Sequence, residues 1–118
     1  MRTASMLAPW GPLLLDVDVA TSPLERMKGW MGRSNIAPRD ALLIQPCNSV
    51  HTFLMRHPID VVFLDRVGRV LAVHARVVAG RMRAHWRATA ALELCAGRAL
   101  ELGIEPGLTL RLSAPAAP

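Results

Sequence analysis

The sequence has no tyrosine, one lysine and only two cysteines among its 118 residues. Two cysteines make neither a disulfide framework nor a zinc pattern, and no C-x-x-C motif is present. The chain also lacks the glycine-rich phosphate loops, the serine elbow of hydrolases, and any run of the ~18 apolar residues that a membrane-spanning helix needs. We therefore expect no structural metal and no cofactor.

The composition, 52% hydrophobic over 118 residues, predicts a single domain, 1–118, with its core at about 13–112. We expect an N-terminal arm, 1–12, and an Ala/Pro tail, 113–118, to be flexible. Pro9 and Pro12 interrupt the first apolar patch and no cleavage pattern follows, which predicts a cytoplasmic protein without a signal peptide. In that compartment Cys47 and Cys95 are expected to be free thiols.

Short β-rich runs separated by turn signals predict a mostly β fold. We expect a small antiparallel sandwich or partly open barrel of about six or seven short strands, with one capped helix and one short helical turn. The expected strands are 13–20, 41–45, 50–57, 59–64, 69–78, 90–95 and 108–112. The segment 79–87 is expected to be an irregular loop, and the helical turn to cover 97–102.

The helix is predicted from Ser22 and Glu25, which form a capping box with proline at the first helical position. Its apolar stripe would comprise Leu24, Met27 and Met31, and it can end at Gly32. Gly29 in its middle is unfavourable by ~1 kcal/mol relative to alanine. Close approach of another backbone or of a ligand would explain this glycine.

Asp60 is the one carboxylate inside the apolar run 59–64, which is typical of a strand covered on both faces. A buried charge without partners is costly, so we expect Asp60 to bond to Arg56, His51 or a backbone donor. A structural ion pair and a ligand site explain Asp60 equally well.

The segment 50–57 would place alternate side chains on opposite faces of a strand. One face would carry His51, Phe53, Met55 and His57, and the other Val50, Thr52, Leu54 and Arg56. The first face is typical of a half-polar pocket wall, although histidines bonded to backbone in a core are the commoner arrangement. We favour His51 as the functional histidine.

These motifs together resemble a known family. Residues 46–65 read Pro-Cys-x-Ser-Val-His-Thr-Phe-x-Met-Arg-x-Pro-Ile-Asp-Val-x-Phe-Leu-Asp, which is similar to the central motif of the bacterial and archaeal domain of unknown function 192 family, also called uncharacterised protein family 0127. Further matching positions are Arg26, Gly29, Met31, Arg33, Leu92, Glu93, Leu94, Ala96, Gly97, Gly103 and Gly107. The resemblance implies a compact, mostly β domain with no established activity, and relatives are often exported.

Three positions depart from the family pattern. Trp30 replaces a leucine, Leu54 stands where glycine or tryptophan is usual, and Leu108 replaces an aspartate after Gly107. Any role of that aspartate in the family does not carry over to this chain.

The candidate ligand-binding residues are Arg26, His51, Thr52, Met55, Arg56, Asp60 and Glu93, with Gly29, Met31, Gly97 and Gly107 as structural motif positions. Few polar groups among apolar residues are typical of a recognition pocket. Because cations outnumber Asp60 in the cluster, we expect an anionic or polyhydroxyl ligand such as a carboxylate, phosphate or sugar. This interpretation favours a ligand-binding or accessory interaction module.

An enzyme is the main alternative: a hydrolase or transferase with Asp60 or Glu93 as general base and His51 as its partner. Cys47 as a nucleophile activated by His51 is disfavoured, because four residues of extended strand span roughly 13 Å.

The segment from Arg66 to Arg87 contains six arginines and no acidic residue, and the net charge of the chain is +5. Such a face suits nucleic acid, an acidic protein partner or an anionic surface, although a solvated surface is the favoured interpretation. Trp86 is the only aromatic residue there, so the segment lacks a stacking platform and nucleic acid is disfavoured.

Overall fold

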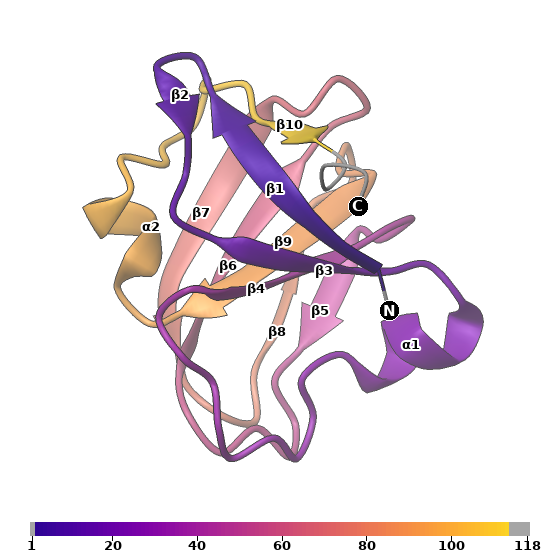
Figure 1. The fold of residues 1–118 in the computed structure, drawn as a ribbon. Helices are drawn as coiled ribbons and strands as arrows, with labels where there is room; N and C mark the ends of the chain where they lie inside the picture. Colours follow the sequence, from indigo (N-terminus) through magenta and orange to yellow (C-terminus); the bar gives the residue numbers. More distant parts are fainter. Residues whose placement is uncertain (1, 114–118) are drawn as a thin grey trace.

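The computed structural model describes residues 2–113 as a sheet-rich fold with two short helices (Figure 1). In chain order the elements are β1 (Arg2–Ala8), β2 (Gly11–Pro12), β3 (Asp16–Ala20), α1 (Pro23–Lys28), β4 (Asp40–Ile44), β5 (Ser49–His51), β6 (Ile59–Leu64), β7 (Val70–Val77), β8 (Met82–Ala84), β9 (Ala90–Cys95), α2 (Arg98–Glu101) and β10 (Arg111–Ser113). In this part of the chain, neither helix has the length and apolar content to cross a membrane.

The main sheet has the strand order β10-β1-β3-β4-β9-β6-β7 and curls into a half-barrel, with β2 paired to β1. Strands β5 and β8 form a separate two-stranded sheet. The predicted mostly β fold is thereby confirmed. One pair, β3 with β4, is parallel, because α1 and a long loop carry the chain back between them.

The two edges of the curled sheet are joined by the stretch that follows α2. The amide of Val70, at the start of β7, donates to the carbonyl of Leu108 at 2.8 Å, and the amide of Gly107 donates to the carbonyl of Val70 at 2.9 Å. The amide of Leu110 donates to the carbonyl of Gly68, also at 2.8 Å. The chain then continues into β10, which pairs with β1. Pairing of the edges leaves fewer free backbone groups at the sheet margins.

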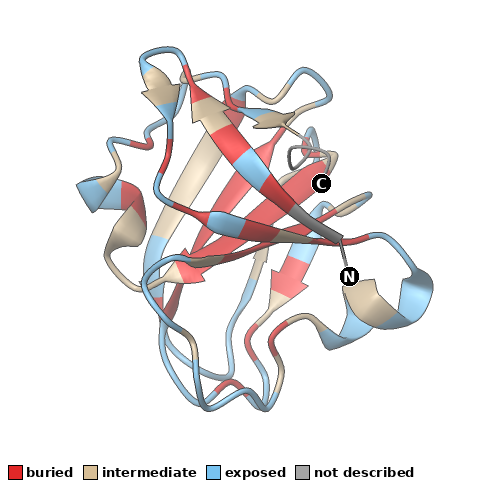
Figure 2. Cartoon of the chain, viewed as in Figure 1, coloured by how far each residue is buried: buried red, intermediate tan, exposed pale blue. Residues whose placement is uncertain are grey.

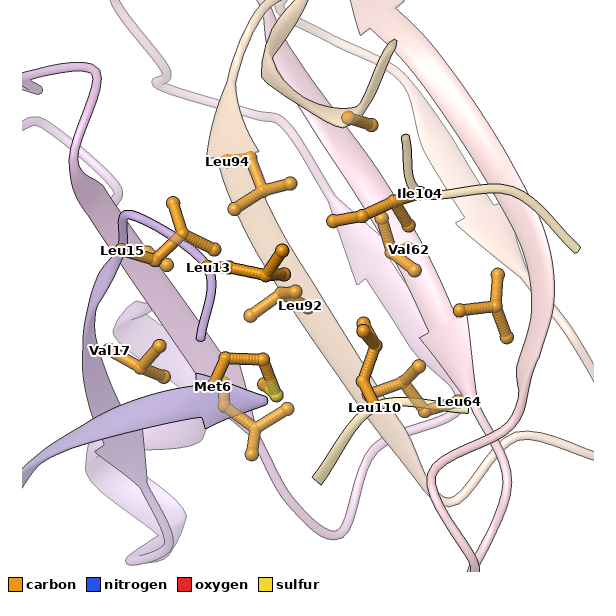
Figure 3. Packing of buried hydrophobic residues seen from close by; sticks show 14 of the residues in the cluster. Met6, Leu13, Leu15, Val17, Val62, Leu64, Leu92, Leu94, Ile104 and Leu110 are labelled. Carbon is orange, nitrogen blue, oxygen red and sulfur yellow. The ribbon is translucent and has the colours of Figure 1, made fainter. Parts of the chain in front are cut away.

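All six residues of β6 are buried, which shows that side chains pack on both faces of the sheet (Figure 2). Val62 and Leu64 enter the first core, which the curled sheet encloses together with α2 and the closing stretch (Figure 3). Ile59, Val61 and Phe63 enter the second core, on the opposite face. The first core consists of Met6, Ala8, Leu13, Leu15, Val17, Ala41, Leu43, Val62, Leu64, Val70, Ala90, Leu92, Leu94, Ala99, Ile104 and Leu110.

The second core lies where the loop after α1 and the segment around β5 cover the sheet. Trp30, from that loop, is its largest fully buried side chain. Its members are Ala20, Trp30, Leu42, Ile44, Val50, Met55, Ile59, Val61, Phe63, Val77, Ala88 and Ala91. This packing places β5 and the loop that follows α1 over β4, β6 and β9, on the side of the sheet opposite α2 (Figure 1).

Helix α1 begins as predicted, with the side chain of Ser22 accepting from the Glu25 amide and Glu25 bonding back to the Ser22 amide. It ends earlier than expected, at Lys28, because Gly29 has a φ of 50° and a ψ of −133° that no helix continues. The predicted stripe is not a core face: Leu24 is 69% exposed and Met27 65% exposed. The helix is held by its cap and by contacts of its last turn.

The prediction of a flexible arm over 1–12 is wrong, because β1 lies within it and its backbone pairs with both β3 and β10. Met6 on β1 is fully buried in the first core, so the apolar patch there is a strand. The predicted tail begins with Ser113, which lies in β10, and residues 114–118 lie outside the described part of the chain.

The expected strand 50–57 is also wrong beyond His51. β5 is three residues long, and Leu54, with a φ of 63°, lies in an irregular turn. The expected loop 79–87 contains β8, which pairs with β5. Two segments too short to show strand periodicity therefore stabilise one another by cross-strand bonding.

We predict that Gly68→Ala destabilises the protein by ~1–3 kcal/mol more than Gly80→Ala does. Both glycines have a φ near 80°, so each alanine carries the same left-handed backbone cost of roughly 1–2 kcal/mol. A Cβ at Gly68 would also collide with the carbonyl of Leu110, whereas a Cβ at Gly80 meets nothing within 4 Å. Urea unfolding of both variants measures the difference. Equal losses would show that closure of the sheet at Gly68 tolerates a side chain.

Candidate functional site

An inner cavity of about 180 Å³ lies between the end of α1, the loop that follows it, β5 and the second-core face of β9. It is lined by Arg26, Met27, Lys28, Gly29, Trp30, Met31, Ile44, Cys47, Ser49, Val50, His51, Met55 and Glu93. Most of this wall is apolar, and its charged or titratable side chains come from α1, the segment after β4, β5 and β9. Such a mixture is typical of a small-molecule site.

Glu93 is the buried acid of this cavity. It follows Ala91 on the second-core face of β9, and only 3% of its surface is exposed. The amide of Trp30 donates to its carboxylate, while Oε1 has no hydrogen-bond partner in residues 2–113. Burial raises the pKa of Glu93 to about 7, against an ordinary value of 4.5, and the Trp30 amide opposes that rise. At neutral pH the group therefore both accepts and donates a proton readily.

Arg26 reaches the cavity from the last turn of α1. Its Nη1 donates to the carbonyl of Pro46 at 3.1 Å, which ties α1 to the segment after β4. Its Nε is buried and bonds to no other group in the described chain. A guanidinium nitrogen can only donate, so Arg26 offers one unused donor to the cavity.

His51 closes the other side of the cavity at the end of β5. Its ring stacks on Phe53, with ring centroids 5.3 Å apart and an interplanar angle of 23°. Its Nδ1 is buried and lacks a hydrogen-bond partner among residues 2–113. Arg26, His51 and Glu93 thus line one cavity, and each holds one buried polar atom without a hydrogen-bond partner in residues 2–113.

Gly29 leaves room at the carboxylate of Glu93. A Cβ at this position would lie 3.6 Å from Oε1 of Glu93 and 3.8 Å from Cδ1 of Ile44. The neighbours are side-chain atoms, so the predicted close approach of another backbone or of a ligand stays a prediction. The φ of 50° by itself favours glycine at this position.

Cys47 lies near both Arg26 and Glu93. Burial, first, and the carboxylate of Glu93 raise the pKa of the Cys47 thiol, whereas a hydrogen bond to Ser49 and the charge of Arg26 lower it. The thiol of Cys47 donates to the carbonyl of Ser49 at 3.2 Å. A thiol with a raised pKa is a poor nucleophile at neutral pH, so this environment also disfavours Cys47 as a nucleophile activated by His51.

A wider outer groove of about 590 Å³ adjoins the inner cavity. The two share Arg26, Met27, Ile44, Cys47 and Ser49, and the groove adds Pro23, Pro46, Asn48, Ala88 and Thr89. Arg26 is the single charged residue in the groove lining, and its other polar side chains are neutral or thiol groups. Met27 and Pro23 of α1 form one apolar side of the groove.

Asp60 is fully buried and bonded to backbone donors, as predicted. Its oxygens accept from the amides of Arg76 at 2.9 Å, Gly97 at 3.1 Å and Ala99 at 2.9 Å. However, alternation along β6 places Asp60 on the first-core side with Val62, whereas Glu93 lies on the second-core side. The predicted grouping of Asp60 with His51 and Arg56 is therefore wrong.

The remaining candidates divide between the cavity and other parts of the fold. Met55 and Met31 line the inner cavity, but Arg56 is exposed and contributes to neither space. The hydroxyl of Thr52 donates to the carbonyl of Val78 at 2.7 Å and accepts from the amide of Arg81 at 2.8 Å, so it anchors the β5–β8 region. Gly97 and Gly107 lie at α2 and in the closing stretch.

Sequence reasoning missed Ser49, Asn48 and Thr89 as site residues. The first two follow Cys47 directly in the family-like motif, so that motif was the available signal. Thr89 had none, because it is distant in sequence and is brought beside Cys47 by tertiary pairing: the amide of Cys47 donates to its carbonyl at 3.0 Å.

The arginines of the segment from Arg66 to Arg87 spread around β7 and β8 without forming one pocket. All but Arg83 are exposed, and Arg87 packs over the ring of Trp86, which is 86% exposed. Arg83 is close enough to His74 to lower its pKa, after the larger effect of burial. No cluster of three His, Cys, Asp or Glu residues suited to a metal occurs in residues 2–113, and the absence of a metal stays a prediction.

A family model described as DUF192, an uncharacterised conserved region, matches residues 8–112. A proposed transcription regulator from Sinorhizobium meliloti 1021 shares 24% sequence identity at a TM-score of 0.82, covering 94% of this chain and 92% of its own. A protein of unknown function from Novosphingobium aromaticivorans DSM 12444 shares 22% identity at a TM-score of 0.81, covering 92% and 83%. These two likenesses establish the fold alone.

A proposed exported protein from Burkholderia pseudomallei K96243 is similar at 14% identity and a TM-score of 0.52. The likeness covers 94% of this chain but only 24% of that one. Among curated proteins, none matches this chain.

We predict that Asp60→Ala lowers the free energy of unfolding by about 3–5 kcal/mol, because it leaves three buried amides without their acceptor. The matched control is Asp16→Ala, which breaks an exposed ion pair with Arg39 and should cost under about 1 kcal/mol. Chemical unfolding of both variants tests this. A loss at Asp60 no larger than that at Asp16 would contradict the structural role.

We predict that Glu93 makes the protein less stable as the pH rises from about 4.5 to 7. Its folded pKa lies above its ordinary value, so the stabilisation is complete below pH 4.5 and is lost as the pH rises through 7. The full loss is about 3 kcal/mol, and Glu93→Gln should remove it from the difference between unfolding energies at pH 4.5 and pH 8. Glu105→Gln, at an exposed position, should keep the wild-type difference. A Glu93→Gln profile parallel to wild type would refute this prediction.

Proposed function

The chain belongs to the domain of unknown function 192 family, and we propose that it is a small-ligand-binding module. Its site is the inner cavity with the adjoining groove, and its ligand is an anionic or polyhydroxyl molecule held by Arg26, His51 and Glu93. The observation that carries the proposal is that three residues lining one cavity each hold a buried polar atom without a hydrogen-bond partner in residues 2–113.

The unpartnered atoms of Arg26, His51 and Glu93 destabilise the unliganded fold. A buried polar atom without a partner costs ~1–3 kcal/mol, and native proteins keep few of them. Three at one cavity are therefore a concentrated cost to folding. A ligand that bonds to all three recovers part of that cost on binding, which favours recognition at this place over a purely structural explanation.

An enzyme of the hydrolase or transferase class is the second candidate, and one observation favours it. Glu93 combines near-complete burial with a pKa of about 7, the property of a general acid or base working near neutral pH. His51 on the same cavity would be its partner. Asp60 drops out of this alternative, because backbone amides occupy its carboxylate on the other side of the sheet. Binding is preferred, because the polar groups of the cavity are few and lie among apolar side chains.

The proposed setting is the cytoplasm. Cys47 and Cys95 are both free thiols, as suits a reducing compartment. Fractionation of cells that produce the untagged protein would test this location, and recovery outside the cytoplasm would contradict it.

The binding proposal predicts ligand-dependent stabilisation. At 100 times its dissociation constant, a ligand specific for the folded state should raise the free energy of unfolding by ~2.7 kcal/mol. We would titrate phosphate, acetate and glucose and measure thermal unfolding. The gain with at least one of them should be lost in Arg26→Gln and His51→Ala, which remove one unused polar atom each.

Arg56→Gln is the matched control, since it makes the same chemical change at an exposed arginine outside the cavity. It should keep the full gain. Sugars and some anions also stabilise proteins by exclusion from their surface, so the difference between Arg26→Gln and Arg56→Gln is the decisive quantity. Equal gains in all four proteins would refute binding at this cavity.

A further inference from the structure

We infer that the site takes a neutral polyhydroxyl ligand, a carbohydrate longer than one sugar ring, with one end in the inner cavity and the rest along the outer groove. This inference rests on the proposed binding function and narrows it to one class of ligand. Three features of the site support it: the mixed sense of its hydrogen-bonding groups, the opposed charges of Arg26 and Glu93, and the neutral lining of the groove.

The unused atoms of the inner cavity differ in hydrogen-bonding sense. Nε of Arg26 only donates, Oε1 of Glu93 accepts when the carboxylate is ionised, and Nδ1 of His51 does either according to its tautomer. A hydroxyl group both donates and accepts through one oxygen. Neighbouring hydroxyls on one ring can therefore bond to donor and acceptor atoms alike, whereas an ionised carboxylate only accepts.

The charges of the cavity disfavour a simple ion. Arg26 and Glu93 act on the Cys47 thiol in opposite directions, so both charges lie near the same point of the wall. They form no ion pair with each other within residues 2–113. When Glu93 is ionised, an anion drawn to Arg26 would meet its carboxylate, and an amine drawn to Glu93 would meet the guanidinium and Lys28. A neutral ligand bonds to both without either repulsion.

The outer groove continues the same chemistry. Asn48, Ser49 and Thr89 supply neutral amide and hydroxyl groups, and Met27 and Pro46 supply apolar surface. Sugar rings present hydroxyls at their edges and C–H groups on their faces, so such a lining suits both parts of a ring. The inner cavity of 180 Å³ has the volume of roughly six water molecules, and the groove of 590 Å³ has room for further rings.

An amino-acid zwitterion is the nearest competitor. Its ammonium group would bond to Glu93 and its carboxylate to Arg26. That ligand would leave His51 and the neutral groups of the groove without use, and burying two full charges carries a heavy desolvation cost. The test therefore includes a zwitterion.

The experiment is a titration of ¹⁵N-labelled protein followed by NMR chemical shifts, which detects weak binding at named residues. The polyhydroxyl probes are glucose, maltotriose, cellotriose and the trimer of N-acetylglucosamine, and the comparison probes are phosphate, acetate and glycine. We expect at least one trimer to cause saturable shifts at Gly29, Ser49 and His51, with at least threefold higher affinity than glucose.

The variants separate the two spaces. Glu93→Gln and Arg26→Gln should each lower trimer affinity at least tenfold, while Arg56→Gln should leave it unchanged. Thr89→Val removes one hydroxyl from the groove alone, so it should weaken the trimer and spare glucose. The spectrum of each variant shows whether it is folded, and Thr89→Val keeps the inference testable if Glu93→Gln is not.

The possible results separate the carbohydrate ligand from the proposed binding function. Saturable binding of phosphate, acetate or glycine at these residues, without binding of any sugar, would overturn the carbohydrate and leave a binding site in place. Glucose binding as tightly as every trimer would overturn the extended ligand. Shifts from no probe at all would overturn both.

Discussion

The carboxylate of Asp60 holds together three segments that are distant in the chain. From the buried strand β6 it accepts amides of β7, of the turn before α2 and of α2 itself. Arg76 has a left-handed φ of 52°, and the bond to Asp60 offsets part of the strain in that conformation. Helix α2 has four residues and no capping side chain of its own, so Asp60 serves as the acceptor for its first amides. The position of the stretch that closes the sheet follows from that of α2.

Glu93 is the counterpart of Asp60 on the neighbouring strand, with the opposite outcome. β6 and β9 are paired along their whole lengths, and the two carboxylates lie on opposite faces of the same sheet. Asp60 has three amide donors, whereas Glu93 has one oxygen without a hydrogen-bond partner among residues 2–113 and has a raised pKa. Complete hydrogen bonding characterises a structural group, and an incompletely bonded buried acid characterises a functional one. This contrast places the candidate site on the α1 side of the sheet.

Several features were predictable from sequence because they depend on neighbouring residues alone. The capping box of Ser22 and Glu25 and the apolar run of β6 identify their elements without tertiary information. β5 and β8 were not predictable, because three-residue strands show no periodicity and form only by pairing with each other. β1 was mistaken for a flexible arm for a related reason: its place in the sheet comes from partners at 16–20 and 111–113.

For the site, the sequence determined which residue types are available: a buried acid in β9, an arginine on a capped helix, a histidine within the family-like motif and a glycine that no regular helix favours. The tertiary structure decided which of them meet. Alternation along paired strands sends Asp60 and Glu93 to opposite faces, and the irregular turn at Leu54 removes Arg56 from the cavity. The local period of a strand determines which side chains share a face, but the face on which a cavity forms depends on what packs there. The loop carrying Trp30 packs on the second-core face, over β4, β6 and β9, and α1 lines the cavity beside it.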